Sequence, residues 1–149
     1  MPSATLATPV GPVTVTEEAG LVTRLGWHGG HDDRSPTLDA ALDQIGAYFA
    51  GARESFDLPL DYGTGFQSGF LRALTAIPFG QTRTYGDLAK LLGVSARAIG
   101  QACGANRIPI LIPCHRVLAQ CGLGGYSGGG GVETKVALLR LESAGSLLI

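Results

Sequence analysis

Residues 84–104, TYGDLAKLLGVSARAIGQACG, hold the pattern that decides the fold of the C-terminal half. Thr84 is followed three residues later by Asp87, a variant of the capping box that begins a helix. Apolar residues at helical spacing form the expected buried stripe up to Gly93: Leu88, Leu91 and Leu92. Ser95 caps a second helix with its own apolar face: Ala98, Ile99, Ala102 and Cys103. Two short helices joined by a glycine-containing turn predict a helix-turn-helix, although many helical hairpins that bind nothing share this pattern.

Helical patterns lie on both sides of this hairpin. A helix over residues 66–77 is predicted to end before Pro78 and Gly80. The last helix spans about 132–142, with these residues facing inward: Val132, Val136, Leu138 and Leu139. Glu142 continues that face, and a carboxylate at a helix C-terminus opposes the macrodipole by roughly 0.3–1 kcal/mol. Glu142 is therefore expected either to have a specific partner or to lie on a frayed, solvated end.

The N-terminal half is typical of a small α/β domain. Extended segments are expected at 5–8, 13–16 and 21–27, and Thr37 is expected to cap a helix that ends near residue 49. An alternating apolar pattern over 56–60 predicts a further strand. Asp61 begins a glycine-containing boundary, so we expect two domains, residues 1–61 and 62–149.

Composition and charge limit the class of protein. The chain has 149 residues, 45% hydrophobic and 15% charged, as in soluble globular proteins, and no apolar run approaches the ~20 residues that cross a bilayer. Three cysteines, an odd number, favour a reducing cytoplasm. Residues 1–65 carry three basic and nine acidic groups, whereas residues 66–149 carry eight basic and three acidic groups. This division indicates either a C-terminal half that faces nucleic acid or two solvated surfaces of unequal charge.

Two histidines in the N-terminal half, His28 and His31, lie beside Asp32 and Asp33. This half contains neither a cysteine nor a third histidine. Since structural zinc sites usually need four such ligands, we interpret the segment as a solvated loop and expect no metal.

The segment PCHRV at 113–117 follows a short apolar run at 108–112 that is expected to be a buried strand. A free thiol with a pKa of ~8.5 is only a few per cent ionised at pH 7, and an adjacent imidazole is the usual means of activating it. Neighbouring side chains do not normally face each other, so His115 is expected to act on Cys114 through an irregular turn or a water molecule. Glu142 is the candidate group to orient the imidazole.

Residues 122–131, GLGGYSGGGG, contain seven glycines in ten positions. Such a run could be a flexible linker. The Tyr126–Ser127 pair in its middle instead favours a loop that approaches a flat ligand closely. A phosphate-binding loop is not expected, because the Lys and Ser/Thr that end such a loop are missing.

Together, IPCHRV at 112–117 and GYSGG at 125–129 resemble the O6-alkylguanine-DNA alkyltransferases, also called methylated-DNA–protein-cysteine methyltransferases. The similarity covers most of the C-terminal half and only loosely the N-terminal half. It implies an α+β protein with a ribonuclease-H-like N-terminal lobe packed on a mainly helical lobe. It also implies direct repair of double-stranded DNA, in which O6-alkylguanine is flipped out of the duplex and loses its alkyl group irreversibly to the protein.

The resemblance implies a role for each matching residue. Cys114 would accept the alkyl group after His115 and a water take its proton, with Glu142 holding the histidine. Asn106 would brace the active-site turn, and Tyr85 would help to neutralise the leaving guanine. The substrate pocket would be lined by Tyr126, Ser127, Pro109, Cys103 and Val117. The DNA-binding residues would be Arg97, Ser95, Ala96, Thr84 and Arg116, with Arg97 entering the base stack.

No cofactor and no membrane partner are expected, and the protein is expected to be a monomer whose cooperativity on DNA is left open. O4-alkylthymine is a second candidate substrate. Three alternatives remain: an alkyltransferase-like protein that binds lesions without repairing them, a cysteine hydrolase with many turnovers, and a plain DNA-binding regulator. Cys114 argues against the first, and the basic helix-turn-helix half argues against the second. The third predicts that replacing Cys114 has no effect.

Overall fold

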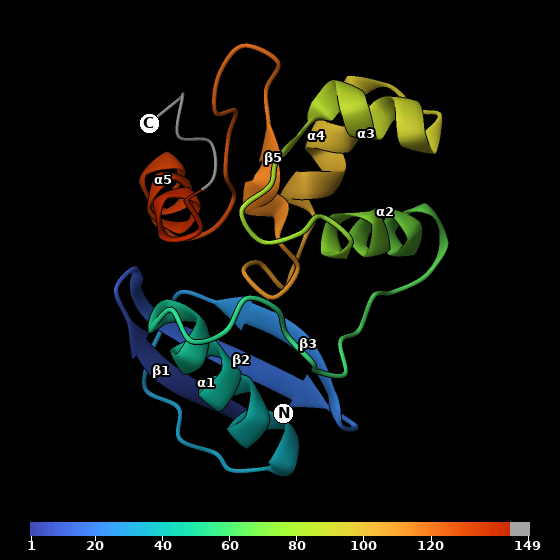
Figure 1. The fold of residues 1–149 in the computed structure, drawn as a ribbon. Coiled ribbons are helices and arrows are strands. Elements are labelled where there is room, and N and C mark those ends of the chain that lie inside the picture. The colour runs from blue at the N-terminus through green and yellow to red at the C-terminus, as the bar shows by residue number, and fades with distance from the viewer. Residues whose placement is uncertain (144–149) are drawn as a thin grey trace. The chain divides into compact units, whose positions relative to one another are not determined.

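The computed structural model describes residues 1–143 and has the predicted mixed α+β fold (Figure 1). It forms two compact units, Met1–Asp61 and a second that begins at Tyr62. Positions 144–149 of the predicted second domain lie outside the described residues. Within residues 1–143, no helix is both long enough and apolar enough to cross a bilayer.

The first unit is a three-stranded antiparallel sheet covered by one helix. Strands β1 (Ser3–Thr8), β2 (Gly11–Glu18) and β3 (Leu21–Gly26) lie in the order β1-β2-β3. Helix α1 (Pro36–Phe49) contacts all three strands. Apolar side chains from both layers form the core, including Val13, Val15, Val22, Leu38, Ala41 and Ile45.

Two predictions for this unit are wrong. Ser35, not Thr37, caps α1 and accepts a 3.1 Å hydrogen bond from the Leu38 amide. Pro36 fits the first helical position because no amide proton is needed there. The segment 56–60 is not a regular strand: among residues 1–143 it makes one bridge, between Val22 and Leu60. Pro59 explains this, because a proline cannot donate to a sheet.

The second unit is mainly helical and carries the helix-turn-helix. Its elements are α2 (Gly65–Thr75), β4 (Arg83–Thr84), α3 (Tyr85–Leu92), α4 (Ala96–Gly104), a 3₁₀ helix (Cys114–Arg116), β5 (Val117–Leu118) and α5 (Val132–Leu141). Both capping-box bonds of α3 are present, because the Thr84 amide donates to Asp87 and the Asp87 amide donates to Thr84. The Ala98 amide donates to Ser95 at the start of α4, as predicted.

The buried faces of two helices are shifted from the predicted ones. Leu91 is 71% exposed, and Ala89 is buried with Leu88 instead. Helix α3 has only eight residues and packs mainly on α4, so its far side remains open. Val132 is also exposed, at the first position of α5, while Thr134 and Lys135 join Leu138 and Leu139 inside.

Candidate active site

The segment 108–112 is buried as predicted but is a tight turn rather than a strand. The Ile112 amide donates to the Ile108 carbonyl at 2.9 Å, and Ile110 has a left-handed φ of 71°. Asn106 closes this turn: its side-chain amide donates to the Ile112 carbonyl, and its oxygen accepts from the Ile108 amide, both at 3.0 Å. A left-handed β-branched residue is strained and needs such support from its surroundings.

Cys114 begins the 3₁₀ helix directly after this turn. The residue is 5% exposed, and burial raises the pKa of its thiol. The Asn106 side chain and the Lys135 ammonium act in the opposite direction on that pKa. Cys114 thus lies between a left-handed turn and a 3₁₀ helix, and such an irregular backbone was one of the two geometries expected for a Cys-His neighbour pair.

Behind Cys114 lies a buried cluster of three charged or polar side chains. His115 Nε2 lies 2.7 Å from Glu142 Oε2, so Glu142 has a specific partner and does not lie on a solvated end. Arg116 donates to both oxygens of Glu142, at 2.8 and 3.0 Å, and to the Ile77 carbonyl at 2.7 Å. Burial lowers the pKa of His115, which favours the neutral imidazole, while Glu142 opposes this shift.

This cluster corrects one site prediction. Arg116 was expected to bind DNA, but it is 5% exposed and its guanidinium is engaged by Glu142 and Ile77. A buried carboxylate needs a paired cation, because an isolated charge is costly to remove from water. Arg116 therefore serves Glu142 and is not available to a DNA backbone.

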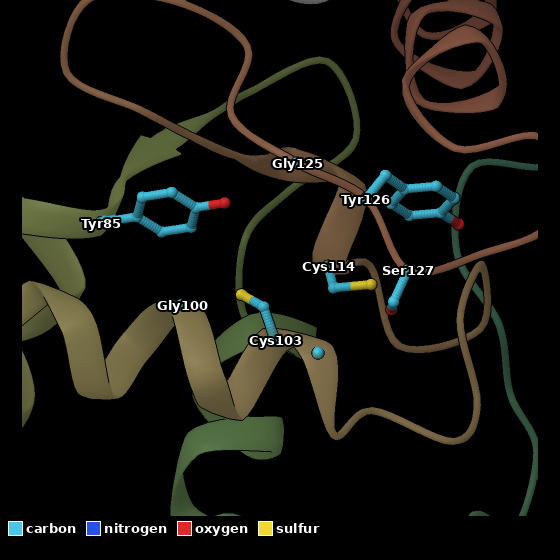
Figure 2. A pocket seen from close by; sticks show the side chains of 8 residues that line it. Tyr85, Gly100, Cys103, Cys114, Gly125, Tyr126 and Ser127 are labelled. Carbon is cyan, nitrogen blue, oxygen red and sulfur yellow. The ribbon is translucent and has the colours of Figure 1, made fainter.

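A cavity of about 260 Å³ opens beside Cys114. Figure 2 shows Tyr85 on one side, Tyr126 and Ser127 on the other, and the thiols of Cys103 and Cys114 between them. The remaining lining residues are glycines: Gly100, Gly104 and Gly125. Gly100 and Gly104 lie on the same face of α4 as Cys103, so no side chain enters the cavity at these two positions.

Two predicted pocket residues do not line this cavity. Pro109 and Val117 are both buried, Pro109 in the turn closed by Asn106 and Val117 in β5. The sequence did not lead us to predict Gly100 and Gly104 as pocket residues. Their spacing of four residues places them on one face of a helix, and this was a usable signal.

Tyr85 is held closely by the glycine-rich loop. A Cβ at Gly124 would lie 2.8 Å from the Tyr85 hydroxyl, and Gly124 has a φ of 72°, so both space and backbone require glycine. Burial raises the pKa of the Tyr85 phenol, which keeps it protonated as a hydrogen-bond donor. Burial likewise raises the pKa of Cys103 to about 12, so this second pocket thiol stays neutral.

Lys135 is a buried residue of the site that the sequence interpretation missed. Its side chain is fully buried and donates to the carbonyls of Val117, Leu123 and Gly125. A signal was present, since Lys135 precedes Glu142 by seven residues and lies on the same helical stripe. The glycine-rich loop is thus fastened at several points and is not a free linker.

The predicted DNA-binding residues on α4 are exposed at its N-terminus. Ser95, Ala96 and Arg97 are all exposed, and Arg97 has no hydrogen bond or ion pair within residues 1–143. Thr84 is half-buried, and its hydroxyl is used by the α3 cap. In the N-terminal unit, the described residues include no group of three or more histidine, cysteine or acidic side chains placed to hold a metal ion.

Comparison with known proteins matches both units to one family. Residues 65–144 match the DNA-binding domain of 6-O-methylguanine DNA methyltransferase, and residues 1–62 match its ribonuclease-like domain. The methylated-DNA–protein-cysteine methyltransferase of Mycobacterium tuberculosis (strain H37Rv) is 41% identical, covering 94% of this chain and 91% of the relative. The constitutive enzyme of that name from Bacillus subtilis is 38% identical, covering 93% of each chain.

Solved structures agree with this assignment. The crystal structure of M. tuberculosis OGT in complex with DNA has a TM-score of 0.83 at 41% identity, covering 96% of this chain and 93% of the other. The O6-methylguanine-DNA methyltransferase of Pyrococcus kodakaraensis has a TM-score of 0.63 at 28% identity, covering 95% and 98%. On the sequence matches to both domains and on these structures, the chain belongs to the family of methylated-DNA–protein-cysteine methyltransferases.

Proposed function

We propose that this protein repairs DNA by moving an alkyl group from O6 of guanine to the sulfur of Cys114. The bond between the alkyl carbon and Cys114 Sγ forms as the bond to O6 breaks. The product thioether is stable, so each molecule acts once. The observation that carries this proposal is the Cys114 thiol beside a cavity lined by two tyrosines, with a buried His115–Glu142 pair next to it in the chain.

Activation of Cys114 is assigned to His115. The neutral imidazole donates its Nε2 proton to Glu142, which leaves Nδ1 as the basic nitrogen. Nδ1 is buried and has no hydrogen-bond partner within residues 1–143. A water between the thiol and Nδ1 would carry the proton from Cys114 to His115, and Glu142 would stabilise the imidazolium that forms.

The pocket side chains are assigned to the base. Tyr85, with its phenol protonated, would donate a proton or hydrogen bond to the guanine anion as it leaves. Tyr126 and Ser127 would line the alkyl side near O6, together with Cys103. O4-alkylthymine presents a similar alkoxy group on a smaller ring, so it is a second candidate substrate.

Access to the cavity requires that the base leave the duplex. Flipping costs a few kcal/mol and is easiest for a damaged, weakly paired base. Arg97, exposed at the start of α4, would enter the stack and fill the space that the base leaves, while Ser95 and Ala96 would bring the helix N-terminus close to the backbone.

The stoichiometry of the reaction tests this function. Duplex DNA containing O6-methylguanine, added in excess, should lose one methyl group per protein molecule and then stop. Continued turnover would support a hydrolase instead. Tight binding to the lesion without any methyl loss would support a non-catalytic alkyltransferase-like protein. Cys114→Ala should abolish transfer while retaining binding to the same duplex.

A further inference from the structure

Lys135 is an unusual residue to find inside a small protein. It is fully buried, whereas lysine is almost never fully buried unless it is paired. No carboxylate accepts from it among the described residues; its three partners are backbone carbonyls. The three protons of the ammonium therefore match three acceptors, and the charge itself is not neutralised.

One of the three carbonyls belongs to β5, and the other two belong to the loop between β5 and α5. Val117 belongs to β5, directly after the 3₁₀ helix that carries Cys114, and its carbonyl is 2.7 Å from Lys135 Nζ. Leu123 and Gly125 precede Tyr126 in the loop that runs from β5 to α5 (Figure 1). One side chain thus joins the strand after the nucleophile to the loop that carries the pocket wall.

Lys135 and Glu142 lie on one stripe of α5, seven residues and about 10 Å apart along the helix axis. At one end of the stripe Glu142 holds His115, and at the other end Lys135 holds the pocket loop. A single helix therefore positions both His115, the proposed base, and the loop that carries the pocket residues Tyr126 and Ser127.

On the proposed function, we infer that Lys135 is a positioning residue with two effects: it fixes the loop carrying Tyr126 and Ser127, and its charge stabilises the Cys114 thiolate. The second effect follows from its charge inside a site where little water screens it. Lys135 lowers the pKa of both pocket thiols, and the thiols in turn raise the pKa of Lys135 against the effect of burial.

The other groups that face Cys114 do not supply this charge. Cys103 from α4 and Tyr85 from α3 are neutral acids that would only repel a thiolate once ionised. Asn106 contributes a neutral hydrogen bond, and His115 is neutral before it accepts the proton. The remaining buried cation, Arg116, is offset by Glu142. Removing the charge of Lys135 should therefore raise the pKa of Cys114.

Lys135→Gln tests the charge, because glutamine keeps donors for the carbonyls but is neutral. The rate at which iodoacetamide modifies Cys114, followed on its peptide from about pH 6 to 10, reports the thiolate directly and without DNA. We expect the curve to move to higher pH by about one unit, with about tenfold slower modification near pH 7. The pH profile of methyl transfer should move in the same direction.

Thr134→Val is the matched control. Thr134 is the neighbouring residue, and its hydroxyl donates to the Gly129 carbonyl of the same loop, but it carries no charge. This variant should loosen the loop without moving either pH profile. Lys135→Arg, which keeps the charge, should move the profile less than Lys135→Gln does.

If Lys135→Gln slowed the iodoacetamide reaction equally at every pH, Lys135 would act only through structure. An unchanged pH profile would overturn both effects. If Lys135→Gln did not fold, Lys135→Arg would decide the charge effect: a profile shifted by as much as one pH unit would overturn it, and an unshifted profile would support it. Failure of the proposed function is separate: the unaltered protein would then not transfer methyl at any pH, although Cys114 would still show its iodoacetamide profile.

Discussion

Arg97 and Arg116 belong to the same basic half of the chain, yet the structure places them in opposite environments. Arg97 is exposed at the start of α4 and has no partner among residues 1–143. Arg116 is buried behind Cys114, where it holds Glu142 and the Ile77 carbonyl. The basic residues of one half of the chain thus lie in two environments: Arg97 is open to solvent, and Arg116 balances a buried carboxylate.

The two environments predict that Arg116 affects the free energy of unfolding and that Arg97 affects the reaction with DNA. A buried, hydrogen-bonded ion pair is costly to break, because the remaining charge has no solvent. An exposed arginine contributes little to folding but a measurable amount to DNA binding. Substitutions at Arg116 should therefore change mainly the stability of the fold, and substitutions at Arg97 should change mainly the reaction with duplex DNA.

The largest effect is expected from breaking the buried pair. Arg116→Met leaves the Glu142 carboxylate buried without its cation, so the free energy of unfolding should fall by about 3–5 kcal/mol. Urea denaturation followed by circular dichroism measures this loss. The same substitution at the exposed site, Arg97→Met, should change stability by less than about 0.5 kcal/mol. Equal stability of the two variants would remove the distinction between the arginines.

A smaller effect is expected at Arg97, on the rate of reaction with duplex DNA and not on folding stability. Arg97→Ala should slow methyl transfer from duplex DNA by about tenfold, or ~1.4 kcal/mol, because nothing then fills the space left by the flipped base. Transfer from the free base O6-methylguanine requires no flipping and should be unchanged. Rapid-quench assays with both substrates measure the difference. A wild-type rate on duplex DNA would show that Arg97 has no part in flipping.

The smallest effect is expected at the exposed Leu91, with the buried Leu88 as its contrast. Leu88 and Leu91 lie three residues apart in α3, but Leu88 is 2% exposed and Leu91 is 71% exposed. Leu91→Gln should change the unfolding free energy by less than about 0.5 kcal/mol, whereas Leu88→Ala should cost about 2–5 kcal/mol. Thermal denaturation distinguishes the two. A large loss for Leu91→Gln would mean that this side chain is covered in solution.

Short-range signals predicted the local structure well. The capping box of Thr84 and Asp87 and the Ser95 cap depend on neighbours within three residues, so spacing was enough to find them. Glu142 was singled out by its spacing on the buried stripe, which left a specific partner and a solvated helix end as alternatives, and the structure shows two partners. His115 was predicted, but Arg116 was expected to bind DNA instead.

The remaining errors concern contacts between distant segments. The run at 108–112 is apolar enough for a strand, but no strand in the described part of the chain pairs with it, and Asn106 closes it into a turn. The inward stripe of α5 was predicted from its apolar residues, which included Val132 and left out Lys135. The structure puts Lys135 inside, where the carbonyls of three residues that follow Cys114 accept from it. Such convergence depends on the tertiary fold and leaves no local pattern.

Of the three cysteines, Cys114 alone should be the consumed acceptor. The direct test is to let the full-length protein react with duplex DNA bearing isotope-labelled O6-methylguanine, digest it, and measure its peptides by mass spectrometry. We predict one labelled methyl group per molecule, on the peptide that contains Cys114, with Cys103 and Cys121 unmodified. Label on Cys103 or Cys121, or loss of methyl from DNA with no label on the protein, would show that Cys114 is not the acceptor.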